Sequence, residues 1–548
     1  MKRIARAIAV LLLGSTTLAV GATAAHAVAL SSRFVSVEPT RLLDTRSGLG
    51  APAGRVGANA TLNVMVAGRG GVPVNNVTAV VLNVTVTGAN GAGFVTVFPG
   101  ATPVPNVSNL NMDHVGQTVA NLVTVPLGAD GTVAFVTSVG THLIADVFGY
   151  YTPAAGPSAG RFVASGPTRV FDSRNSARIK AGGRLTVGLV GTVPADATAA
   201  VVNITAVDAD GPGFWTAWAS GRPQPNTSNL NTETKGHVIA NAAIVPVGPD
   251  GLDLFTTAGG NLVIDVTGYF TGASAAASND GLFVPLAPSR VLDTRGGGTL
   301  NPLGPSIKPQ AGWNTEVIVA GALGIPSDVS GVVANITIVG ATRAGFVTAY
   351  PARTELSNTS TANAAAGQTV PNHAIIPVSI HGFALFTSGG AHLLADISGY
   401  FTGIARAESG PKAANPGPSL PLHLSVPAIG LEDTIREGID DATVMAGPGH
   451  WPGTSLPGLP GISTIFGHRI SNSHPFLNLN QLSPGDEIKI TDSNGVVYRY
   501  IVDRTDIVDP TEVGKAQEGD SALELIACHP PGSIEFRIVV RAKLVSAS

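Results

Sequence analysis

The sequence predicts an all-β protein with several domains in series. Charged residues make up only 12% of the 548 residues, whereas Gly is abundant, and a composition rich in Val, Thr and Ala favours strands over helices. Alternating stretches such as Thr78 to Thr87 and Thr198 to Val207 are bounded by Gly, Asn and Pro turns, as in β-sandwich or jelly-roll units. The chain is also too long for one ordinary domain.

The N-terminus has the features of a secretory signal. Lys2, Arg3 and Arg6 precede an apolar stretch at 7–20, and Ala25-His26-Ala27 fits the small-x-small pattern that signal peptidase cleaves. The apolar stretch is short for a membrane span, so a cleaved signal peptide at 1–27 is favoured over a retained anchor. We therefore expect a secreted or cell-surface protein.

One unit then occurs three times. The octapeptide Pro39 to Arg46 returns at Pro167 to Arg174 and at Pro288 to Arg295. Each copy continues with Asn-x-Thr, then Gly-Phe, then Asp-x-x-Gly-Tyr, at Asn83, Asn203 and Asn335, Phe94, Phe214 and Phe346, and Asp146, Asp265 and Asp396. We assign repeat 1 to 28–155, repeat 2 to 156–275 and repeat 3 to 276–404. A period of about 120–130 residues is too long for a solenoid unit, which predicts three independent β-sandwich or jelly-roll-like domains.

Each repeat motif has a structural and a functional interpretation. Asp44 and Arg46 stand two apart on a predicted strand, hence on one face, and a structural bracket is favoured over a ligand site. The Asn-x-Thr triplets match a glycosylation acceptor but lie in predicted buried strands, so we interpret them as strand residues. The units resemble repeat modules of secreted actinobacterial proteins, and a cell-wall polymer is a possible ligand. The net charge of −4 suggests no nucleic-acid partner.

A Pro, Gly and Ala-rich spacer at 405–420 precedes a C-terminal domain at 421–548 that holds the only cysteine, Cys528. A lone cysteine is more often a small buried hydrophobe than a nucleophile. Here, however, His468 and Arg537 occur in the same domain, and a thiol used as a nucleophile needs a nearby base or cation and a donor for the attacked carbonyl. Runs at 463–466, 486–500, 523–527 and 536–540 read as strands, with a turn at Asn494-Gly495.

The ordered motifs of this domain resemble the sortase transpeptidases, more narrowly their classes E and D. The motifs are Gly447 to Thr454, Ile465 to Arg469, Pro475-Phe476, Leu482 to Asp486 and Cys528 to Arg537. The resemblance implies an eight-stranded β-barrel in which Cys528 is the nucleophile, His468 the general acid/base and Arg537 the residue that positions substrate or stabilises the oxyanion. The family usually has Thr before the catalytic cysteine, where this chain has Ala527.

By the same resemblance, the domain would cleave a Leu-Pro-x-Thr-Gly-like or Leu-Ala-x-Thr-Gly-like sorting signal between Thr and Gly through a thioacyl enzyme. An amine acceptor of cell-wall or pilin type would then resolve the thioester. Two alternatives remain: hydrolysis of the thioester by water, and a wall-binding or adhesive protein whose sortase-like domain is inactive.

Further residues near these motifs have weaker roles. We expect His450 and His529 to line the substrate groove or its rim and Ala527 to affect substrate fit, while a solvated loop suits His474 at least as well. The histidines lack convincing metal-ligand spacing with each other or with Cys528, so we expect no metal and no cofactor.

Overall fold

The computed structural model describes residues 31–295, 308–407, 409, 421–452, 454–459, 462–471, 474–492, 495–513 and 522–547. The predicted signal peptide and nearly all of the predicted spacer after 407 lie outside these residues. The fold is all-β apart from short helical segments, as predicted, and α1 (Asp441–Ala446) is the one α-helix of the described ranges. No helix within them is long and apolar enough to cross a membrane.

Each repeat forms a β-sandwich of two four-stranded sheets. The strands of repeat 1 are β1 (Ser32–Asp44), β2 (Thr61–Met65), β3 (Ala79–Thr87), β4 (Gly93–Pro99), β5 (Leu110–Met112), β6 (Val119–Pro126), β7 (Thr132–Thr137) and β8 (His142–Pro153). One sheet has the order β1-β8-β3-β6 and the other β2-β7-β4-β5. The predicted strands at Thr78 to Thr87 and Thr198 to Val207 are confirmed as β3 and β11.

Repeats 2 and 3 have the same topology. The elements of repeat 2 are β9 (Phe162–Asp172), η1 (Ser173–Asn175), β10 (Arg184–Val187), β11 (Ala199–Val207), β12 (Gly213–Ala219), β13 (Leu230–Thr232), β14 (Ile239–Pro246), β15 (Leu252–Thr256) and β16 (Asn261–Phe270). Those of repeat 3 are β17 (Phe283–Asp293), β18 (Trp313–Val317), β19 (Val329–Val339), β20 (Gly345–Pro351), β21 (Ala362–Ala364), β22 (Val370–Pro377), β23 (Phe383–Thr387) and β24 (His392–Thr402). The sheets are β14-β11-β16-β9 with β10-β15-β12-β13, and β22-β19-β24-β17 with β18-β23-β20-β21.

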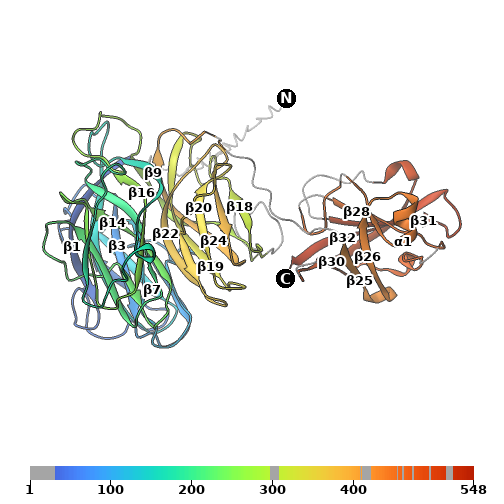
Figure 1. Cartoon of the computed structure of the whole chain (residues 1–548), viewed down its shortest axis with the longest axis horizontal. Helices are drawn as coiled ribbons and strands as arrows, with labels where there is room; N and C mark the ends of the chain where they lie inside the picture. Colours follow the sequence, from blue (N-terminus) through green and yellow to red (C-terminus); the bar gives the residue numbers. More distant parts are fainter. Residues whose placement is uncertain are drawn as a thin grey trace, which may run out of the picture.

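The three repeats are not independent domains, which corrects the expectation drawn from their period. They pack into one body (Figure 1), and β1 pairs with β17, which joins repeats 1 and 3 in an eight-stranded sheet. Six buried aromatic rings, two from each repeat, meet in a shared cluster: Phe34, Tyr151, Phe162, Phe270, Phe283 and Phe401. Burial of these large rings between the repeats stabilises the association of the three repeats.

Asparagines close the three repeats into a cycle. The Asn of each Asn-x-Thr triplet donates from Nδ2 to a backbone carbonyl of the next repeat at 2.6–2.7 Å: Asn83 to Ser228, Asn203 to Ser360 and Asn335 to Ser108. A second set accepts backbone N–H groups of the neighbouring repeat's edge strand at 2.9–3.1 Å: Asn121 from His373, Asn241 from Leu122 and Asn372 from Ala242. Each repeat therefore caps the exposed edge of another, which protects strands that would otherwise be open to further pairing.

The charged motif is internal to each repeat. Arg41 Nε lies 2.8 Å from Asp146 Oδ1, and Arg46 binds Asp44 through Nε and Nη2 at 2.9 and 2.7 Å. Arg46 lies just beyond the end of β1, so the two residues meet across a turn rather than on a strand face. The hydrogen bonds from Arg46 lower the pKa of Asp44. The same pairs recur in repeats 2 and 3.

The C-terminal domain is a closed barrel with the strand order β25-β26-β27-β28-β31-β32-β30-β29. Its elements are β25 (Leu422–Val426), η2 (Pro427–Ile429), β26 (Leu431–Glu437), α1, β27 (Gly449–His450), β28 (Ile462–Phe466), η3 (Leu479–Gln481), β29 (Glu487–Thr491), β30 (Val497–Val508), η4 (Pro510–Glu512), β31 (Ala522–His529) and β32 (Phe536–Ala547). The predicted eight-stranded barrel is therefore confirmed. So is the predicted β29–β30 hairpin, although Asn494 of its turn lies outside the described residues.

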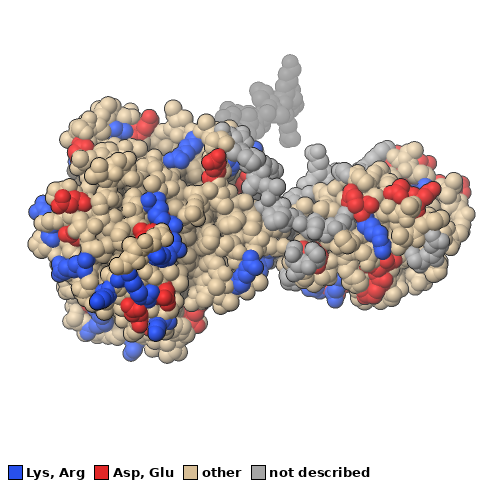
Figure 2. All heavy atoms as spheres, in the orientation of Figure 1, with Lys and Arg blue, Asp and Glu red and all other residues tan. Residues whose placement is uncertain are grey.

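The barrel touches repeat 3 directly. Trp313, at the start of β18, is 5% exposed and packs into the barrel's hydrophobic core, and Gln310 Nε2 donates to Tyr498 Oη at 3.2 Å. The contact lies where β30 begins and β32 ends (Figure 1). Figure 2 shows Lys, Arg, Asp and Glu scattered over this face of the molecule, with wide uncharged areas between them, in keeping with the low charged fraction.

Candidate active site

Cys528 and Arg537 lie directly opposite each other on adjacent antiparallel strands. Cys528 of β31 is the register partner of Arg537 of β32, so their Cα atoms are about 4.5–5.5 Å apart and their side chains share one face of the sheet. Leu523, Leu525 and Ala527 belong to the barrel core, which places Cys528 on the outer face by alternation. The cysteine is half-buried and forms no disulfide.

Arg537 holds its position through its own strand. Its Nη1 donates to the carbonyls of Ile534 and Phe536 at 2.9 and 3.0 Å. Among the described residues, its Nε and Nη2 have no hydrogen-bond partner. The guanidinium therefore keeps donors free on the Cys528 side of the sheet, where an oxygen that gains negative charge would need them.

His468 follows the parallel strand on the other side of β31. Phe466 of β28 pairs with Ile526, and Gly467 N donates to Ile526 O at 3.0 Å. His468 is the next residue, so it leaves β28 near the end of β31 that carries Cys528. His468 is half-buried, and no described residue hydrogen-bonds its imidazole, which leaves both ring nitrogens available for proton transfer.

The loop that carries His468 is fixed by the residues after it. A Cβ on Gly467 would lie 2.5 Å from the ring of Phe476, so only glycine fits there. Phe476 N in turn donates to His468 O at 3.1 Å. Gly467 and Phe476, both within the motifs quoted above, therefore set the backbone on which His468 stands.

Arg469 is a buried residue of this region that the sequence did not predict. It is 4% exposed and donates to Leu477 O, to Asn480 Oδ1 and to His529 Nδ1, the last at 3.0 Å. Burial lowers the pKa of Arg469, and the nearby thiolate form of Cys528 acts in the opposite direction. The only sequence signal for Arg469 is its position directly after His468.

The bond from Arg469 also defines the tautomer of His529. A guanidinium only donates hydrogen bonds, so Nδ1 of His529 accepts and the proton of the neutral imidazole is on Nε2. His529 is half-buried at the end of β31, so it remains a candidate for substrate contact.

The other predicted side chains lie elsewhere. His450 is 2% exposed, with Nδ1 2.9 Å from Glu437 Oε2 and Nε2 3.0 Å from Ser455 O, so it braces a loop instead of lining an open rim. Ala527 is 2% exposed in the barrel core. Its expected contact with substrate does not fit this placement, because its side chain points away from the Cys528 face. His474 is exposed.

Two further features mark the outer face of the sheet. Trp451 packs edge-on against Phe466, with ring centroids 5.3 Å apart. Glu524, four residues before Cys528 and 1% exposed, accepts from Arg541 Nε at 2.9 Å. No group of three or more His, Cys, Asp or Glu within the described part of the chain could hold a metal ion.

Comparison with known proteins gives the family. Residues 424–545 match the sequence family described as Sortase domain. Similar solved structures are sortase C-1 from Actinomyces oris (32% identity, 23% of this chain and 72% of that chain, TM-score 0.22), a lid mutant of sortase A from Corynebacterium diphtheriae (30%, 24% and 75%, 0.22) and sortase C from Streptococcus pneumoniae (26%, 23% and 67%, 0.22). No curated protein matches the chain. The C-terminal part of this chain, over residues 424–545, is therefore a sortase domain.

Proposed function

We propose that the C-terminal domain is a cysteine transpeptidase of class E or D type that cleaves a Leu-Pro-x-Thr-Gly-like or Leu-Ala-x-Thr-Gly-like sorting signal. The observation that carries the proposal is the direct pairing of Cys528 with Arg537 at the end of β31, beside the strand β28 that His468 follows. Its substrates are proteins with sorting signals, and its acceptor is an amine of the cell wall or of a pilin.

The proposed chemistry uses two steps at Cys528. The thiolate attacks the carbonyl carbon of Thr, the Thr–Gly peptide bond breaks, and His468 protonates the departing amine. The acyl group is then held as a thioester. An incoming amine attacks the same carbon, gives its proton to His468, and displaces the thiolate. Arg537 donates to the carbonyl oxygen as it gains charge in each step.

We propose further that the protein is exported and acts at the cell surface. The proposal rests on the sequence of residues 1–27, where basic residues, an apolar stretch and a small-x-small site occur in order. Fusing these residues to a reporter enzyme and comparing culture medium, membrane and cytoplasm would test it. A reporter held entirely in the cytoplasm would contradict export.

The activity is tested by incubating the full chain with a panel of sorting-signal peptides and a small amine, and reading products by mass. The expected products are the peptide cut after Thr and joined to the amine, together with a thioacyl adduct on Cys528. Cys528→Ala should abolish both while leaving the fold intact, because alanine fits a small site. Undiminished cleavage by this variant would refute the mechanism. Product carrying water in place of the amine would identify hydrolysis, and no adduct with any peptide would favour a binding protein with an inactive domain.

A further inference from the structure

Repeat 2 contains a hollow that the other two repeats fill. In strand β9, Ser165 takes the place of Val37 in repeat 1 and Leu286 in repeat 3, because Phe162, Phe34 and Phe283 precede them at the same register. Val37 and Leu286 both pack against the cores of their repeats. Ser165 Oγ, in contrast, is buried and has no hydrogen-bond partner within the described ranges. The serine therefore removes apolar volume and adds an unsatisfied hydroxyl.

The loop above this position is shorter in repeat 2. In repeat 1, a Cβ on Gly71 would lie 3.2 Å from Val37, and one on Gly70 would lie 2.8 Å from Leu42, so the loop rests on β1. The buried residues Leu189 and Val193 of repeat 2 take the places of Val66 and Val72, and two fewer residues lie between them. Less of the loop therefore covers β9.

The residue at the tip of the loop differs too. Arg69 of repeat 1 lies across the gap and donates to Leu42 O at 3.0 Å. The shorter loop of repeat 2 has no residue that corresponds to Arg69, and its Val190 is 99% exposed. Together, the smaller floor residue and the missing bridge leave the space open.

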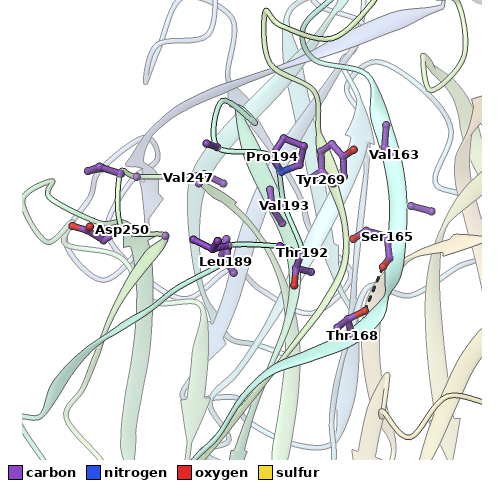
Figure 3. Close-up of a pocket in the computed structure, with 17 residues that line it drawn as sticks. Val163, Ser165, Thr168, Leu189, Thr192, Val193, Pro194, Val247, Asp250 and Tyr269 are labelled. Carbon is purple, nitrogen blue, oxygen red and sulfur yellow. Dashed lines mark hydrogen bonds between the residues drawn. The ribbon is translucent and has the colours of Figure 1, made fainter.

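The result is a cavity of about 720 Å³ between β9 and the loops at 189–195 and 247–251 (Figure 3). This volume lies within the range of small-molecule sites, about 300–1,000 Å³. The walls are mostly Val, Leu, Ala and Pro, and Figure 3 shows Tyr269, Thr192 and Thr168 among them.

The polar groups of the cavity select for an uncharged ligand. None of the described residues that line it is Lys, Arg or His, and the one charged side chain is the carboxylate of Asp250 at the mouth. In repeat 1, the equivalent Asp130 accepts from both N and Oγ1 of Thr132 at 3.0 and 2.8 Å. The turn is one residue shorter in repeat 2, where Leu252 pairs with Val187 as Val133 pairs with Val64 and no threonine follows Asp250. Asp250, which is exposed, keeps its carboxylate free of hydrogen bonds among the described residues.

We propose that repeat 2 binds an uncharged saccharide in this cavity. A sugar ring offers C–H faces to the aliphatic walls, while its hydroxyls pair with the carboxylate of Asp250 and with hydroxyls that both donate and accept, those of Thr192 and Tyr269. An anionic ligand would meet a carboxylate and no cation. The site belongs to the repeats alone and does not depend on the function of Cys528.

The test uses the full chain and four neutral trisaccharides, built from N-acetylglucosamine, glucose, mannose or galactose, with trigalacturonate as an anionic comparison. Binding is measured by saturation-transfer NMR and by calorimetry. We expect saturable binding of at least one neutral trisaccharide and none of trigalacturonate. Absence of binding by all four, or equal binding of the anion, would overturn the proposal.

Two variants test whether the ligand binds in this cavity. Ser165→Val restores the floor residue of repeat 1, and Val190→Arg adds a long charged side chain to the loop that lines the cavity, so each should weaken binding at least about tenfold. Val190→Ala is the matched control, because it changes the same exposed position without filling the space, and should bind as the wild type does. Circular dichroism checks that each variant folds. If one of the two cavity-filling variants does not fold, the other variant decides the test. Wild-type affinity in a folded cavity-filling variant would overturn the assignment.

Discussion

Asn241→Ala would test whether the three repeats form one closed body. Asn241 of β14 is 0% exposed and lies between repeats 1 and 2. Its Nδ2 donates to Asn83 Oδ1 at 3.0 Å and to Asn229 O at 2.5 Å, and its Oδ1 accepts from Leu122 N at 3.1 Å. Truncation to alanine removes all three hydrogen bonds and leaves buried polar groups in both repeats.

The cost follows from these three lost partners. A buried donor or acceptor without a partner costs about 1–3 kcal/mol, so three of them predict about 3–9 kcal/mol. Because every 1.4 kcal/mol is a factor of ten, the lower value corresponds to an opening about 100-fold more frequent. In a closed cycle, this loss weakens the edges of all three repeats, whereas in independent domains it would stay within repeat 2.

Hydrogen exchange of the full chain followed by mass spectrometry separates the two outcomes. We expect faster exchange in β3 and β6 of repeat 1 and in β22 of repeat 3, as well as in β14. The matched control is Asn226→Ala, an exposed asparagine of the same repeat with no hydrogen bond among the described residues, which should leave all of these strands unchanged. Exchange that accelerates in repeat 2 alone would refute the closed cycle.

Three further results are expected. Arg537→Lys should lower the rate of peptide cleavage severely with little change in stability, because lysine keeps the charge but loses the planar fork; near-normal turnover would make Arg537 purely structural. Burial lowers the pKa of His373 to about 3, against about 6.5 when unfolded. The unfolded chain is therefore protonated first, and stability that is complete above pH about 6.5 should fall by about 1.4 kcal/mol per pH unit below it. His373→Leu, which copies Leu122 of repeat 1, should flatten this dependence in urea titrations at pH 7 and 5. Finally, a fragment of residues 417–548 should fold and cleave soluble peptide with a lowered melting temperature, because its barrel closes on itself but loses Trp313; a folded fragment without activity would mean that repeat 3 completes the site.

The sequence predicted the individual sandwiches and the barrel because their signals are local. Alternation of apolar and polar residues and the turn residues between them define β3, β11 and the β29–β30 hairpin. The association of the repeats has no such signal. Asn83 and Asn121 read as polar residues in strands, and their partners lie more than a hundred residues away. The period of the repeats alone suggested separate domains.

The sequence predicted those parts of the candidate site that follow from the order of the strands. Cys528 and Arg537 flank a turn, so a hairpin was enough to pair them. The burial of His450 and of Arg469 was not predictable, because it depends on contacts with the loop residues Ser455, Leu477 and Asn480. The inward direction of Ala527 does follow from alternation with Cys528, and applying that rule would have removed it from the substrate contacts.

The contact with repeat 3 also determines where the active site faces. Tyr498 and the end of β32 at Ala547 lie at the repeat body, whereas Arg537 lies ten residues back along β32. At about 3.3 Å per residue, this separation is roughly 33 Å. Cys528 therefore stands at the end of the barrel away from the repeats, and the closed body of three repeats contacts the opposite end through Trp313. A ligand bound in repeat 2 would therefore leave access to Cys528 unchanged.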